Sequence, residues 1–64
     1  MASLTERETE VLACLGEGMT NGQIAGRLCL SEATVKGHVS RLLEKLGCDN
    51  RTRAGLLAYE AGLR

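Results

Sequence analysis

The sequence lacks phenylalanine, tryptophan and proline, and it contains a single tyrosine. Leucine, isoleucine and valine therefore have to fill the core, and no proline interrupts a helix. Glycine is frequent, with eight copies among 64 residues, which suits short helices that end at glycine. A chain of this length forms one small domain that buries only about 60% of the surface its unfolded form exposes. Its stability margin is therefore thin.

Long apolar runs are also missing, and no stretch of the sequence is long enough to cross a membrane. Residues 1–3 are too short to be a signal peptide, and no basic stretch leads into a long apolar run. We therefore expect a soluble chain that stays in the cytoplasm and makes no membrane contact.

The three cysteines, Cys14, Cys29 and Cys48, are odd in number and widely spaced, which argues against a disulfide framework. No C-x-x-C pair occurs, and His38 is not spaced as a zinc partner, so no metal or other cofactor is expected. We expect reduced thiols, with Cys14 and Cys48 in the core and Cys29 accessible in a turn. The sequence also holds no Ser/His/Asp or Cys/His set and no phosphate-cradling glycine loop, so an enzyme is not expected.

The formal net charge is zero, because 8 basic side chains balance 8 acidic ones. These charges are unevenly distributed along the chain. Residues 1–30 carry two Arg and four Glu, a balance of −2, whereas residues 31–64 carry six basic and four acidic side chains, a balance of +2. Local asymmetry matters more than the total for a surface that meets phosphate. The second half is therefore the candidate for binding nucleic acid, with modest non-specific affinity.

The stretch 31–47 has the features of one amphipathic helix over residues 32–46. Ser31 is a favourable N-cap, and Gly47 suits the left-handed residue that follows a helix. At about 100° per residue, one face is apolar. It consists of Val35, Val39, Leu42, Leu43 and Leu46. The opposite face is small and basic over its first half, and it consists of Ala33, Gly37, Ser40, Arg41 and Glu44, with Lys36 on its flank. Such a helix fits the DNA major groove, which admits one α-helix. Phosphate would repel Glu44, so we expect this residue to lie beyond the groove, near the C-terminal end of the helix.

Three shorter helices are predicted, and they cover residues 6–17, 21–28 and 51–61. Thr5 with Glu8, and Thr20 with Gln23, match the capping box, while Asn50 caps the last helix. The second helix, a two-residue connection and the helix over 32–46 follow one another in the order of a helix-turn-helix unit. The predicted fold is all-α, a compact four-helix bundle-like domain that contains this unit.

The last predicted helix is apolar on two sides. The side expected to face the core consists of Ala54, Leu57, Ala58 and Ala61. The opposite side consists of Thr52, Leu56, Tyr59 and Leu63. A terminal helix that is apolar on both sides needs a second partner, so we interpret the second side as a dimer interface. The alternative is that Tyr59 and Leu63 fold back onto their own domain.

Ordered motifs cover nearly the whole chain: residues 4–8 with 10–12, 18–21 with 24–25, 30–36 with 38–39, and 45–47 with 51. Together they resemble the LuxR-type (GerE-like) DNA-binding domain, most closely the C-terminal domain of NarL/FixJ-type response regulators. The resemblance implies a compact four-helix fold. It also implies that the third helix reads the DNA major groove and that the fourth helix often forms a dimer.

Base contacts are the first role that the resemblance implies. In similar domains the residues matching Lys36 and Gly37 approach base edges, and the residue matching Ser40 faces the groove. Gly37 has no side chain, and Ser40 stands where relatives often have Lys or another polar residue, so this sequence departs from the family pattern at two DNA contacts. Arg41 is the candidate substitute, because a bidentate Arg–guanine pair discriminates by about 1–3 kcal/mol.

Phosphate contacts are the second implied role. In similar domains the residues matching Thr34 and Arg51 approach phosphate, and the start of the second helix, here Thr20 and Asn21, does likewise. Arg53 occupies the third position of the last helix, where Glu or Gln would complete a capping box, and its charge opposes the helix dipole there. It faces either a phosphate or water.

These features predict sequence-specific binding of double-stranded DNA by a homodimer, as the output domain of a bacterial two-component response regulator. RNA polymerase is a further candidate partner. Residues 1–64 leave no room for a receiver domain, so we expect a single domain that is the C-terminal fragment of a longer regulator, or a small stand-alone member. Two alternatives are a promoter-binding and polymerase-binding domain like region four of a sigma factor, and a helical protein-interaction module. The zero net charge favours the second alternative.

Overall fold

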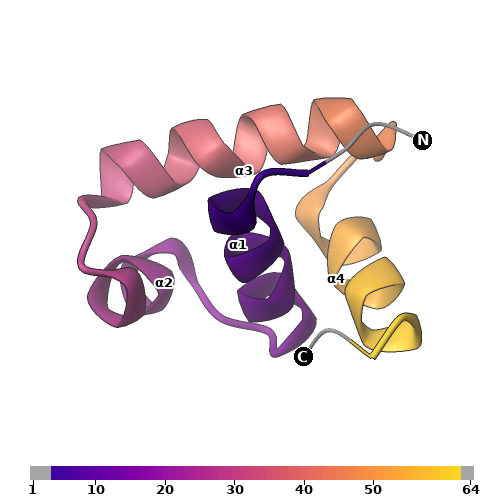
Figure 1. The fold of residues 1–64 in the computed structure, drawn as a ribbon, viewed down its shortest axis with the longest axis horizontal. Coiled ribbons are helices and arrows are strands. Elements are labelled where there is room, and N and C mark those ends of the chain that lie inside the picture. The colour runs from indigo at the N-terminus through magenta and orange to yellow at the C-terminus, as the bar shows by residue number, and fades with distance from the viewer. Residues whose placement is uncertain (1–3, 63–64) are drawn as a thin grey trace.

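The computed structural model describes residues 4–62, which form four α-helices with no strand among them. These are α1 (Glu6–Gly16), α2 (Asn21–Leu28), α3 (Glu32–Leu46) and α4 (Arg51–Glu60). The longest helix, α3, lies across one side of the molecule, with α2 beneath its N-terminal end (Figure 1). Helices α1 and α4 lie side by side and make the most extensive helix–helix contact. The predicted all-α fold is confirmed. The helices predicted over residues 6–17 and 51–61 each end one residue earlier in the structure.

Each helix begins at the N-cap that the sequence predicts. The caps are Thr5, Thr20, Ser31 and Asn50, and each side chain accepts a hydrogen bond from the backbone N–H three residues later. Both predicted capping boxes are complete, because Glu8 and Gln23 accept the backbone N–H of their own caps at 2.8 and 2.9 Å. The helix starts are therefore fixed by local sequence.

The turn between α2 and α3 contains a left-handed residue that is not glycine. Cys29 has a φ of 57°, and its N–H donates to the carbonyl of Ala25, which also accepts the N–H of Leu30 at 2.9 Å. The Cys29 side chain is exposed, as predicted. Cys14 is buried, which raises the pKa of its thiol, whereas Cys48 is only half-buried against the core. All three thiols are free.

The core is built from aliphatic side chains of all four helices. Its largest fully buried members are Val11, Ile24, Val35 and Leu42. The inner stripe of α3 is largely as predicted, although Leu43 and Leu46 are only half-buried at its edge. This core holds α3 with its opposite face outward.

The predicted inner face of α4 is confirmed for Ala54 and Ala58 but is wrong for Leu57 and Ala61. Ala54, Gly55 and Ala58 are buried, whereas Leu57 is 44% exposed and Ala61 is exposed. The reason is a close approach between helices. A Cβ atom added to Gly55 would lie 2.7 Å from the carbonyl oxygen of Leu15, so only glycine fits there. Small residues therefore face inward, and Leu57 moves to the flank.

Candidate nucleic-acid interface

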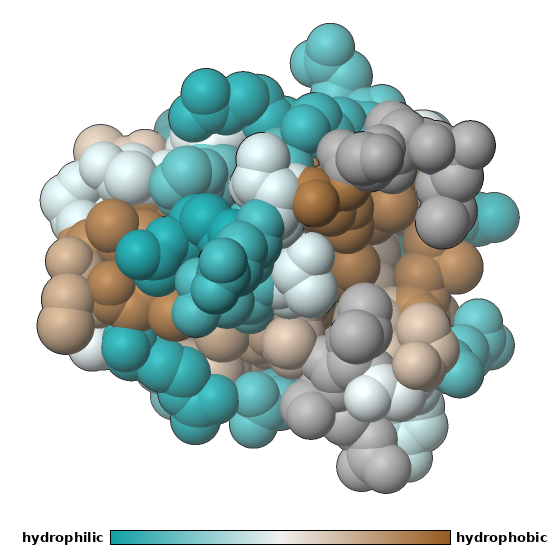
Figure 2. Space-filling view, viewed as in Figure 1, coloured by the Kyte–Doolittle hydropathy of each residue, from teal (hydrophilic) through white to brown (hydrophobic). Residues whose placement is uncertain are grey.

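The outer face of α3 presents the predicted base-facing residues together. Lys36, Ser40 and Arg41 are exposed, and Gly37 is half-buried among them. Hydrophilic residues line much of the edge of the molecule along α3 (Figure 2). The face stands clear of the other helices, so its side chains can enter a groove about the width of one helix.

Thr34 lies in the first turn of α3, where its hydroxyl accepts a hydrogen bond from the Ser31 hydroxyl at 2.9 Å. Its backbone N–H donates to the Ser31 oxygen at 3.1 Å, which completes the cap. The Thr34 side chain is exposed, so the same hydroxyl can donate outward while it supports the cap. This geometry is compatible with two roles of the Thr34 hydroxyl, supporting the cap of α3 and contacting a DNA phosphate.

Four basic side chains are held by partners within the fold. Three of them form ion pairs: Arg7 with Glu10 at 3.6 Å, Arg27 with Glu17 at 2.9 Å, and Lys45 with Glu8 at 2.8 Å. The fourth, Arg51, donates hydrogen bonds to Asn21 and to the carbonyl of Met19. Among residues 4–62, the remaining basic side chains make no hydrogen bond or ion pair. They are Lys36, Arg41 and Arg53. The positive charges left free among the described residues are thus on the outer face of α3 and at the start of α4.

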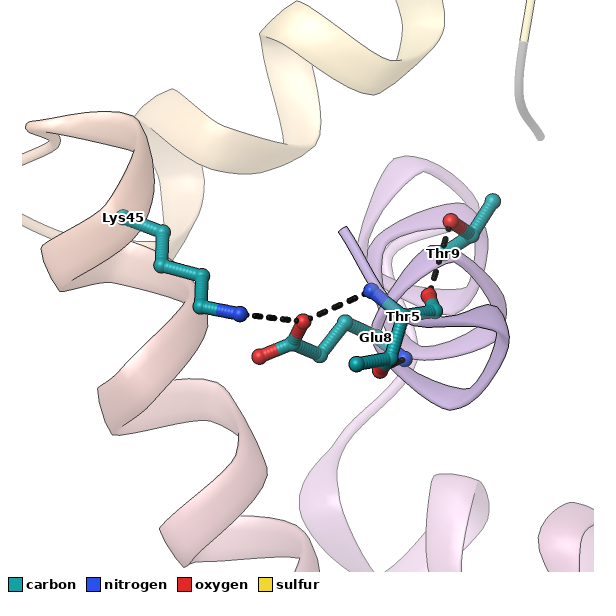
Figure 3. A network of polar contacts seen from close by, with 4 residues as sticks. All are labelled: Thr5, Glu8, Thr9 and Lys45. Carbon is teal, nitrogen blue, oxygen red and sulfur yellow. Dashed lines mark hydrogen bonds and ion pairs between the residues drawn. The ribbon is translucent and has the colours of Figure 1, made fainter. Parts of the chain in front are cut away.

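The ion pair between Glu8 and Lys45 ties α1 to the last turn of α3 (Figure 3). The Lys45 ammonium and the N–H of Thr5 each donate to Oε1 of Glu8 at 2.8 Å. These hydrogen bonds, that of Lys45 foremost, lower the pKa of Glu8 from 4.5 to about 2. The sequence shows only the capping role of Glu8, because Lys45 lies 37 residues further along the chain.

Two predicted phosphate-binding residues are bonded to each other. The Arg51 guanidinium donates to Oδ1 of Asn21 and, at 2.7 Å, to the carbonyl of Met19. This contact anchors the start of α4 against the N-terminus of α2. Arg51 uses only the oxygen of the Asn21 side-chain amide, so the NH₂ group of that amide remains available as a donor. Thr20 is exposed beside it, and its oxygen accepts the N–H of Gln23 at 3.2 Å.

The predicted dimer surface is exposed where the structure describes it. Leu56 and Tyr59 are 59% and 55% exposed, and Thr52 is exposed as well, while Leu63 lies outside the described residues. A groove between the C-terminal end of α1 and α4 borders this surface and is partly lined by Leu15 and Met19. Exposed apolar residues next to an apolar groove form the kind of patch that marks an interaction site.

Two further properties concern only the part of the chain that the structure describes. No cluster of three or more His, Cys, Asp or Glu side chains is placed to hold a metal ion there. None of the four helices is long and apolar enough to span a membrane.

The sequence matches the luxR family of bacterial regulatory proteins over residues 2–58, which is most of the chain. The chain belongs to this family. Among related proteins, the luxR-family domain is 52% identical over 60 residues to the DNA-binding transcriptional activator DevR/DosR of Mycobacterium tuberculosis. It is 46% identical over 63 residues to the transcriptional regulatory protein LnrK of Bacillus subtilis. These alignments cover 94% and 98% of this chain but only 28% and 29% of the two relatives.

Among solved structures, the luxR-family domain is similar to the response regulator ChrA of a heme-sensing two-component system. The TM-score is 0.85 at 44% sequence identity, and the match covers all of this chain and 32% of ChrA. The resemblance drawn from the sequence motifs is therefore confirmed. The family is one of DNA-binding regulators and not a class of enzymes.

Proposed function

We propose that this luxR-family domain binds a specific double-stranded DNA sequence, as the output domain of a two-component response regulator, by inserting α3 into the major groove. One observation carries the proposal. The basic side chains that the fold leaves without a partner among the described residues include two on the outer face of α3, Lys36 and Arg41. Free cations on an exposed helix are suited to phosphate and base edges.

The contacts divide by position. Lys36, Gly37, Ser40 and Arg41 form the proposed base-facing set on the outer face of α3. The proposed phosphate contacts are those of Thr20, Asn21, Thr34, Arg51 and Arg53. Thr20, Asn21 and Thr34 lie at helix N-termini, where the helix dipole favours an anion. Phosphate contacts at two helix starts and at α4 would fix the register of α3 in the groove.

The assembly that we propose is a homodimer formed through the exposed side of α4. Two copies would then read two half-sites, and the symmetry of the DNA site would match that of the dimer. The domain would work within a longer cytoplasmic regulator, with RNA polymerase as a further partner. The chain spans less than a third of DevR/DosR and LnrK, which supports the proposal that it works within a longer regulator.

Selection from a random duplex DNA library at moderate salt, followed by sequencing, tests the proposal. We expect an enriched motif with two related half-sites. The affinity for that motif should fall steeply as salt rises, because phosphate contacts release counterions. Arg7→Ala is the matched control, since Arg7 is held by Glu10 on α1 and should leave the motif unchanged. The absence of any enriched motif, at concentrations that populate a dimer, would favour a protein-interaction module instead.

A further inference from the structure

Gly37 lies at the centre of the outer face of α3, and the fold gives no reason for a glycine there. A Cβ atom added at this position would meet only one atom outside the neighbouring backbone, Nη2 of Arg41 at 3.6 Å, which is ordinary van der Waals contact. At Gly55, by contrast, an added Cβ would collide with a backbone carbonyl. Glycine in a helix interior costs up to about 1 kcal/mol relative to alanine. Gly37 therefore lowers stability without relieving any contact in the core.

The contact with Arg41 shows what the missing side chain permits. Long side chains on a helix lean toward its N-terminus and cover the preceding turn. The Arg41 guanidinium accordingly reaches back to Gly37, one turn nearer the start of α3. In helix-turn-helix proteins the N-terminal part of the recognition helix contacts base edges. Gly37 thus leaves open the space into which the guanidinium extends.

The guanidinium itself is not committed to the fold. Arg41 is exposed and makes no hydrogen bond or ion pair with any residue between 4 and 62, unlike Arg27 and Arg51. All of its N–H donors are therefore available. The planar fork of arginine matches the O6 and N7 acceptors of guanine, which a lysine ammonium engages only as a point charge.

We infer that Gly37 and Arg41 act as one recognition unit that selects guanine in the major groove. Gly37 keeps the groove-facing surface free of a side chain, and Arg41 extends over it to donate two hydrogen bonds to O6 and N7. This inference rests on the proposed function and names one base that the α3 surface selects. Gly37 is a specificity determinant because it controls where the guanidinium lies.

The test begins with the motif selected by the wild-type domain and repeats the selection with variants. Arg41→Ala should lose a guanine at one position of each half-site and bind the wild-type site roughly 5- to 150-fold more weakly. Arg41→Lys should not restore the preference, because lysine lacks the fork. Gly37→Ala should keep the guanine, since its Cβ makes only an ordinary contact. Gly37→Leu should lose it while the circular dichroism of the folded domain is unchanged.

A base analogue supplies an independent measurement. Replacing that guanine by 7-deazaguanine removes the N7 acceptor, so it should weaken binding by the wild type but not by Arg41→Ala. An unchanged motif for both Arg41→Ala and Gly37→Leu, with the wild-type motif present, would overturn this inference and leave the proposed function standing. No enriched motif for the wild type would overturn both. Equal sensitivity of the two proteins to 7-deazaguanine would also contradict the role of Arg41.

Discussion

Helices α3 and α4 both pack one side on the core, but they place their apolar residues differently. In α3 the large side chains Val35 and Leu42 are fully buried, and the outer face is polar. In α4 small residues face inward, and Leu56 and Tyr59 are exposed. The difference follows from how closely each helix lies against its neighbours. Where α4 meets the backbone of α1, no space remains for large side chains, so these form an outer surface that suits a protein partner.

The close approach of α4 to α1 can be disrupted by one methyl group. Gly55→Ala should lower the free energy of unfolding by about 1–3 kcal/mol, because its Cβ meets the rigid carbonyl of Leu15. Gly26→Ala is the matched control on α2. Its Cβ would meet nothing within 4 Å, so it should stabilise the domain by up to about 1 kcal/mol. Thermal unfolding of both variants measures the difference, and equal melting temperatures would show that α4 can shift away from α1.

The polar face of α3 should serve DNA binding and not stability. Lys36→Ala should weaken binding to the selected site by about 1–3 kcal/mol, because one free cation at the base edges is lost. The melting temperature should stay nearly constant, since surface changes away from special features are usually within about 0.5 kcal/mol. Titration of the selected duplex measures the effect, with Arg7→Ala as the control. Unchanged affinity for that duplex would remove Lys36 from the interface.

The exposed side of α4 should serve association. Leu56→Glu places a charge on the proposed dimer surface, where burial of an unpaired carboxylate is unfavourable, and should lower dimer affinity. The monomer should remain folded, because Leu56 is 59% exposed. Sedimentation velocity with and without the selected DNA measures association. Glu60→Gln, a change to a neighbouring exposed residue, provides a control. A sedimentation profile like that of the wild type would contradict an interface on this side.

Lys45, unlike Lys36, is a cation of α3 that the fold uses, and its effect should appear as a pH dependence. The pKa of Glu8 is lowered from 4.5 to about 2, so its contribution to stability is complete above pH 4.5 and lost as the pH falls through about 2. Glu8→Gln cannot ionise and should lack this contribution. The melting temperature of the wild type should therefore exceed that of Glu8→Gln at about pH 6, and the difference should shrink as the pH is lowered to about 2.

The control for this pH dependence is Glu6→Gln, since Glu6 is an exposed carboxylate in the same first turn of α1. This variant should show nearly the same pH profile as the wild type. If both variants behaved alike, the ion pair with Lys45 would make no specific contribution.

The helices were predictable because their signals are local. Thr5, Thr20, Ser31 and Asn50 each satisfy an amide three residues away, and the apolar stripe of α3 repeats at helical spacing. Such features depend on a few neighbouring residues, so the sequence alone indicates them. The outward face of α3 followed from the same periodicity.

The contacts that the sequence did not indicate join residues far apart along the chain. The inward face of α4 depends on the close approach of Gly55 to the backbone of Leu15. The apolar pattern of the sequence predicted that Leu57 would be buried there, but Leu57 is exposed. Likewise, nothing near Arg51 indicates that it bonds to Asn21, which lies 30 residues earlier. These contacts are set by how the helices pack, and helical periodicity does not specify packing distance.

The left-handed turn at Cys29 affects how much conformational entropy α3 loses when the domain binds a ligand. The N–H groups of Cys29 and Leu30 both donate to the carbonyl of Ala25, and α3 begins at Glu32, directly after its N-cap Ser31. The conformational entropy of forming α3 and of setting its angle to α2 is therefore lost when the domain folds, before it meets any ligand. The binding energy of contacts made by α3 is therefore not spent on ordering this helix. The helix is preorganised, and each of its contacts can contribute more fully to affinity.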